Sequence, residues 1–151
     1  MDDGTESGVS SWAWGAITVL AWPAWHWASG YLSAYPLSWL AAVTPSAERE
    51  PSGPGGLYDS PSQILILAAI GLLFGFLGVY LLRRLRAPHV VWIPATVVSL
   101  LMNLTQAVFW AGFSGHGTGA AHMAVQFTIA AGISALIGIG AWLGSRTGRS
   151  A

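Results

Sequence analysis

One segment limits the fold of this chain more than any other: an uninterrupted apolar run of 19 residues from Ile64 to Leu82. A membrane-spanning helix needs about 20 predominantly apolar residues to cross a hydrocarbon core about 30 Å thick. The run is followed by Arg83, Arg84 and Arg86, which suit a helix end at the membrane surface. The segment therefore predicts a transmembrane helix in an integral membrane protein.

The composition agrees with a membrane location and excludes several classes of protein. Of the 151 residues, 54% are apolar and 8% are charged, whereas a soluble domain carries about 25% charged residues. The net charge is zero, which excludes a basic nucleic-acid-binding protein. There is no cysteine, which excludes disulfides, thiolate nucleophiles and cysteine-ligated metals. The lipid bilayer is thus the first expected partner, and nucleic acid is excluded.

The remaining chain divides into three further apolar segments and polar connections. A straight helix over residues 12–43 would be about 48 Å long, more than the hydrocarbon core requires, so we predict that residues 31–43 form a separate interfacial segment. Residues 44–61 contain four prolines and three glycines and predict an outer loop. The sequence thus predicts a single polytopic membrane domain, 1–151, with spans at about 12–30, 63–82, 90–112 and 120–143.

The distribution of arginine predicts the orientation. The connection after the second span and the C-terminal tail carry five of the six arginines, and Arg49 alone lies on the opposite side. Cytoplasmic loops carry the excess of basic residues. We therefore predict an all-α, integral membrane four-helix bundle of the plasma membrane, multi-pass, with N and C termini cytoplasmic.

Glycines and aromatic residues mark two helix faces that could contact other helices. Gly71, Gly75 and Gly78 follow at spacings of four and three, and small residues at such spacing let helix backbones approach closely in lipid. We predict that these glycines pack helices together, either within the chain or in a homo-oligomer or complex with another membrane protein. A second stripe predicts an aromatic anchor at the membrane interface or a docking face: Trp27, Tyr31, Tyr35 and Trp39.

Polar side chains form matching stripes on the third and fourth predicted helices. Such groups are expensive at membrane depth unless they bond inside the bundle or line a wet cavity. The two stripes belong to sequential antiparallel helices, so we predict that they face each other and that Asn103 and Gln106 bond to the fourth helix near Gln126. Interhelical hydrogen bonding and a polar path both remain open. The candidate residues are Thr96, Ser99, Asn103, Gln106, His122 and Gln126.

Three histidines are predicted on the outer side: His26, His116 and His122. Imidazole ligates transition metals such as zinc, copper, nickel or iron, so converging histidines would form a metal site; pH sensing or proton relay is a further alternative. The spacing of His116 and His122 is not the i, i+4 spacing of a helical ligand pair. No cofactor is therefore predicted, and a transition metal is kept as an alternative.

The absence of carboxylates from the predicted spans argues against an enzyme. All six acidic residues lie in 1–6 or in 48–59, so paired carboxylate chemistry is missing from the membrane. We predict a non-enzymatic subunit or interaction protein of a membrane complex. The alternatives are a channel or carrier-like protein with a polar path between helices three and four, and a metal- or redox-linked membrane protein.

Overall fold

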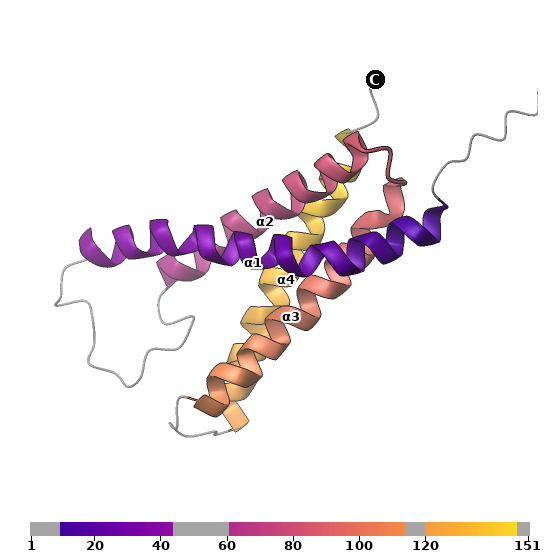
Figure 1. Ribbon diagram of the computed structural model, residues 1–151. Helices are drawn as coiled ribbons and strands as arrows, with labels where there is room; N and C mark the ends of the chain where they lie inside the picture. Colours follow the sequence, from indigo (N-terminus) through magenta and orange to yellow (C-terminus); the bar gives the residue numbers. More distant parts are fainter. Residues whose placement is uncertain (1–9, 44–60, 114–119, 148–151) are drawn as a thin grey trace, which may run out of the picture.

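The computed structural model describes residues 10–43, 61–113 and 120–147, and their side chains over 10–32, 64–109 and 123–147. Within these residues it contains four α-helices (Figure 1): α1 (Ser11–Val43), α2 (Pro61–Arg84), α3 (Trp92–Phe113) and α4 (Ala120–Thr147). A short 3-10 helix, η2 (His89–Val91), leads directly into α3. The prediction of an all-α chain is confirmed.

Three segments of the described chain are long and apolar enough to cross a membrane. They are Ile64–Arg84, His89–Phe109 and Met123–Thr147, which overlap the predicted second, third and fourth spans. The described part of α1 does not reach the same hydropathy, so the span at 12–30 stays a prediction. The predicted outer loop, 44–61, lies outside the described residues except for Pro61.

Helix α1 is a single helix of 33 residues. It continues through Pro23, which removes one backbone donor but is tolerated in a membrane helix. Residues 31–43, predicted as a separate interfacial segment, are the continuation of this helix. Their position relative to a bilayer stays a prediction.

The connection between α2 and η2 is a tight helix-ending turn. The amide of Ala87 donates to the carbonyl of Leu82 and the amide of Arg86 donates to that of Arg83, both at 3.0 Å. Arg86 has a φ of 68°, the left-handed conformation that closes such a C-terminal motif. Pro88 follows and cannot continue the helix. The turn reverses the chain, so that α3 returns beside the bundle (Figure 1).

Helices α2 and α4 pack with their backbones in direct contact at glycines from both helices. A Cβ atom on Gly75, Gly140 or Gly144 would collide with a carbonyl oxygen of the opposite helix, and one on Gly71 would lie 3.1 Å from a side chain. Residue numbers rise together along the two helices, which are therefore parallel. The pairs are Gly71 with Ile137, Gly75 with Ile137, Gly140 with Leu72 and Gly144 with Phe76.

Gly78 faces a different helix from Gly71 and Gly75. A Cβ atom on Gly78 would lie 2.5 Å from Nε1 of Trp25 and 2.7 Å from Cη2 of Trp22, both on α1. The three glycines predicted to share one face therefore contact two neighbours, α4 and α1. All of these contacts lie within one chain.

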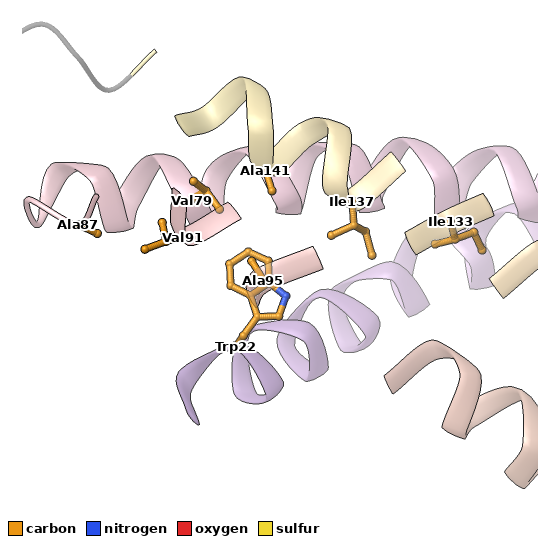
Figure 2. Packing of buried hydrophobic residues seen from close by; sticks show 8 residues of the cluster. All are labelled: Trp22, Val79, Ala87, Val91, Ala95, Ile133, Ile137 and Ala141. Atoms are coloured by element: carbon orange, nitrogen blue, oxygen red, sulfur yellow. The ribbon is translucent and has the colours of Figure 1, made fainter. Parts of the chain in front are cut away.

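The buried apolar core lies where α1, η2 and α3 meet the α2–α4 pair. Its members are mostly small or β-branched side chains, and the Trp22 ring projects from α1 into them (Figure 2). The cluster consists of Trp22, Val79, Ala87, Val91, Ala95, Ile133, Ile137 and Ala141.

Large apolar side chains cover the outside of every helix. Leu20 on α1 is 80% exposed, Leu65 on α2 is 70%, Leu101 on α3 is 59% and Val125 on α4 is 55%. Soluble monomers rarely expose contiguous apolar patches of such extent. The exposed surface therefore agrees with lipid rather than water around the bundle.

The α2–α4 contact predicts a contrast between two glycines. Gly75→Ala places a methyl group against the Ile137 carbonyl, and overpacking of this kind costs about 1–3 kcal/mol. Gly132→Ala has nothing within 4 Å of its Cβ and should leave stability unchanged or slightly higher, because alanine favours helices. Thermal unfolding of both variants in one detergent measures the difference, and equal midpoints would contradict the backbone contact.

Candidate functional site: a buried polar network

The polar stripe of α3 enters the interior of the bundle. Ser99 is fully buried and Asn103 is 5% exposed, whereas Thr96 and Gln106 are half-buried. Thr96 donates from Oγ1 to the carbonyl of Trp92 in its own helix, at 2.7 Å. The stripe thus contains two fully enclosed groups, and each of them bonds to another helix.

Asn103 joins α3 to α4. Its Nδ2 donates to Oγ of Ser134 at 2.9 Å, and the Ser134 hydroxyl donates to the carbonyl of Ala130 at 2.7 Å. Ser134 is itself 2% exposed. The partner of Asn103 is therefore Ser134 and not Gln126, which lies two helical turns earlier on α4.

Ser99 joins α3 to α1. Nε1 of Trp22 donates to Oγ of Ser99 at 2.7 Å, between two side chains that are both nearly inaccessible. Sequence reasoning missed this pair because a tryptophan in a tryptophan-rich segment resembles an interface anchor. The sequence feature that could have revealed this pair is the four-residue spacing of Thr18, Trp22 and His26. This spacing places the three residues on one face of α1, and all three are buried.

His26 extends the network from α1. His26 is 8% exposed, and its ring interacts with the polar side chain of Asn103. The Asn103 amide therefore contacts α1 on one side and Ser134 of α4 on the other. One side chain of α3 thus connects three helices.

A third polar contact of α1 depends on a missing side chain in α2. Nε1 of Trp25 donates to the carbonyl oxygen of Phe74 at 3.0 Å. That carbonyl belongs to a helix, where its usual donor is the amide four residues later, at Gly78. Because Gly78 has no side chain, the indole reaches the second lone pair of the oxygen. The two rings, Trp25 and Phe74, also lie 5.4 Å apart.

The other predicted site residues are distributed as follows. Gln126 is buried on α4, and Gly138 on the same face lies close to Thr96, since a Cβ there would be 2.8 Å from its Cγ2. His116 and the side chain of His122 lie outside the described residues. Among the described residues no group of three His, Cys, Asp or Glu side chains could hold a metal, and the predicted histidine site stays a prediction.

The network is neutral and its members bond to one another or to helix carbonyls. It contains hydroxyl, amide, indole and imidazole groups, and the described residues include no carboxylate. The network in the described residues therefore contains no carboxylate pair of the kind that general acid–base hydrolysis uses. Its polar groups can hold helices together, and they can offer hydrogen bonds to a small neutral solute.

Comparisons with protein-family models, with curated proteins and with solved structures give no match to this chain. Function must therefore be argued from the geometry of this structure.

The geometry predicts how a variant of Asn103 behaves. Asn103→Leu removes hydrogen bonds that are each worth about 0.6 kcal/mol in a membrane, so the bundle should be modestly destabilised and remain folded. A cysteine at position 103 should react slowly with a water-soluble maleimide, because the site is enclosed. Cysteine at exposed Thr147 is the control for rapid reaction. Equally rapid labelling at both positions would mean that water reaches Asn103.

Proposed function

We propose that this chain is a four-span plasma-membrane protein that acts as a non-enzymatic subunit of a membrane complex. One observation carries the proposal: among the described residues its buried polar groups, apart from Nε of Arg83, are engaged in contacts within the chain, while its long N-terminal helix presents large aromatic side chains outward. A protein of this kind contributes a surface and a scaffold, and not a reaction.

The surface of α1 supports the proposal. Its buried line is narrow, so most of its circumference faces away from the other three helices. Trp12 is 78% exposed, Trp27 is 69% and Tyr31 is 70%. Aromatic side chains are enriched where proteins associate, because they bury much area with few rotatable bonds. Helix α1 is thus the best candidate for contact with a neighbouring subunit.

The arrangement of the helix ends agrees with the proposed orientation. The start of α1, the α2–η2 turn and the end of α4 lie toward the same end of the bundle (Figure 1). The arginines at this end include Arg83, Arg84 and Arg146. Arg84 and Arg146 each stack on an aromatic ring of their own helix, at 5.3 Å and 3.9 Å from the centroid. By the positive-inside rule this end faces the cytoplasm.

Cysteine labelling in intact cells tests the orientation. The chain has no native cysteine, so single cysteines report without background. Ser52→Cys should react with an impermeant thiol reagent added outside, and Thr147→Cys should react only after the membrane is opened. The reverse pattern would overturn the orientation, and with it the outer placement of the 44–61 loop.

Site-specific photo-crosslinking tests the proposed role. A photoreactive amino acid at Trp27 of α1, in native membranes, should give a discrete adduct with a protein, whose mass distinguishes a second copy of this chain from another subunit. The same residue at Leu101 of α3, which is 59% exposed, is the matched control and should react with lipid. Lipid adducts alone at both positions would contradict the proposal.

A channel or carrier-like role is the second candidate. The observation in its favour is the buried polar line between α3 and α4, which includes Asn103, Ser134 and Gln126. Polar groups along a path lower the cost of dehydrating a solute. Flux of small neutral solutes into liposomes that falls in the Asn103→Leu variant would favour this role over the first.

A further inference from the structure

We propose that the arginine cluster at the α2–η2 end of the bundle binds the phosphate of an anionic phospholipid headgroup. The described members of the cluster are Arg83, Arg84, Arg86 and Arg146. The proposal goes beyond the role of a subunit, because it assigns a ligand to this end of the molecule whether or not the chain belongs to a complex. It rests on one enclosed guanidinium with unused donors, on two further guanidinium groups held in place, and on the apolar side chains beside them.

The cluster has no counter-ion in the described part of the chain. All six acidic residues belong to 1–6 or 48–59, and the described ranges 10–43, 61–113 and 120–147 contain none of them. Like charges at neighbouring helix ends repel one another, and an anion between them removes the repulsion. The charge at this end of the bundle therefore suits an anionic ligand.

Arg83 is half-buried, and its side chain is fixed by the turn that ends α2. Its Nη1 donates to the carbonyl oxygen of Ala87. Among the described residues, its Nε is the one enclosed side-chain nitrogen or oxygen without a hydrogen bond. Nη2 has no printed partner among these residues either and is not enclosed, so it remains accessible. The guanidinium is thus held in position with donors left for an acceptor from outside, and its planar fork matches phosphate oxygens.

Arg84 and Arg146 are held over aromatic rings of their own helices. The Arg84 guanidinium lies 5.3 Å from the ring centroid of Tyr80, and its Nε donates to the Tyr80 hydroxyl at 3.0 Å. The Arg146 guanidinium lies 3.9 Å from the ring centroid of Trp142. A cation over a ring face is attracted to the π-system, which leaves the Nη groups at the edge of the guanidinium to donate hydrogen bonds. Both side chains are therefore ordered while most of their donors stay unused.

These two arginines project from helix ends that lie side by side. Gly144 of α4 packs against α2, since a Cβ atom there would lie 3.1 Å from the backbone nitrogen of Tyr80. Arg84 follows Tyr80 by one helical turn, and Arg146 follows Gly144 by two residues. Both arginines thus lie just beyond the last glycine contact of the parallel pair, where α2 and α4 end together (Figure 1). One anion at this place is within reach of both helices.

The neighbouring apolar side chains favour a lipid over a free anion. Leu81 is 49% exposed, Leu85 is 65% and Leu143 is 38%, and all three lie within a turn of an arginine of the cluster. A phospholipid offers a charged headgroup to the guanidinium groups and acyl chains to the leucines. Basic sites beside membrane helices bind anionic headgroups in this way. Inorganic phosphate would use the arginines alone.

Native mass spectrometry of the full chain in detergent tests the assignment. The chain is titrated with phosphatidylglycerol, which is anionic, and with phosphatidylcholine of the same acyl chains, which has no net charge. Phosphatidylglycerol should bind at least about fivefold more tightly, the value of one basic side chain beside an anionic headgroup. Excess inorganic phosphate should leave it bound. Displacement of the lipid by inorganic phosphate would assign the site to a free anion and overturn the proposal.

Single substitutions locate the site. Arg84→Gln and Arg146→Gln should each weaken binding of phosphatidylglycerol about fivefold and leave binding of phosphatidylcholine unchanged. Arg49→Gln is the matched control, because it changes the net charge equally within the predicted outer loop, and it should keep the wild-type preference. Thermal unfolding without added lipid checks that each variant is folded.

Three results would overturn the proposal. The first is an unchanged lipid preference in both Arg84→Gln and Arg146→Gln, and the second is an equal loss in these variants and in Arg49→Gln. The third is a wild-type chain that binds both lipids equally, which is the result expected if the chain's own acidic residues neutralise the cluster.

Discussion

The backbone contact between α2 and α4 is the interaction on which the other helices depend. In lipid the apolar surfaces of two helices gain little by leaving the solvent, because the solvent is apolar too. Close packing must supply the attraction between the helices. Gly75 and Gly140 allow it, because without a side chain they let a carbonyl oxygen of the opposite helix approach closely. The parallel α2–α4 pair then forms a platform. Helix α3 attaches to it through α4, and α1 lies across α2 and α3.

The second layer of the structure is attached by polar bonds in addition to close packing at Gly78 and Gly138. Asn103 holds α3 to α4, and Trp22 holds α1 to α3. Each bond is worth little in free energy, but each is directional, so it fixes rotation of a helix about its axis. Apolar packing alone is less selective about rotation, because lipid-facing and buried leucines differ little in environment. The network thus determines which face of α1 remains outside.

The sequence predicted the helices better than it predicted the contacts between them, and the reason is physical. The apolar run from Ile64 to Leu82 predicted α2 because one strong signal, hydropathy over a membrane thickness, decides it. The α3 stripe predicted which face Asn103 occupies, since periodicity gives a rotation. It could not give the partner, because the axial position of α4 depends on close contacts such as Thr96 against Gly138. Asn103 was expected to bond near Gln126, but its hydrogen-bond partner on α4 is Ser134.

Two neighbouring glycines in α2 also show that sequence spacing does not identify the partner helix. Gly75 and Gly78 are three residues apart, which is less than one full turn, so their Cα atoms point about 60° apart around the helix. In the sequence this angular difference is small enough that the two glycines are assigned to one face of the helix. In the bundle it is enough for Gly75 to contact α4 while Gly78 admits the Trp25 indole from α1. One narrow face of α2 therefore positions two helices, and a side chain at either glycine would separate a different pair.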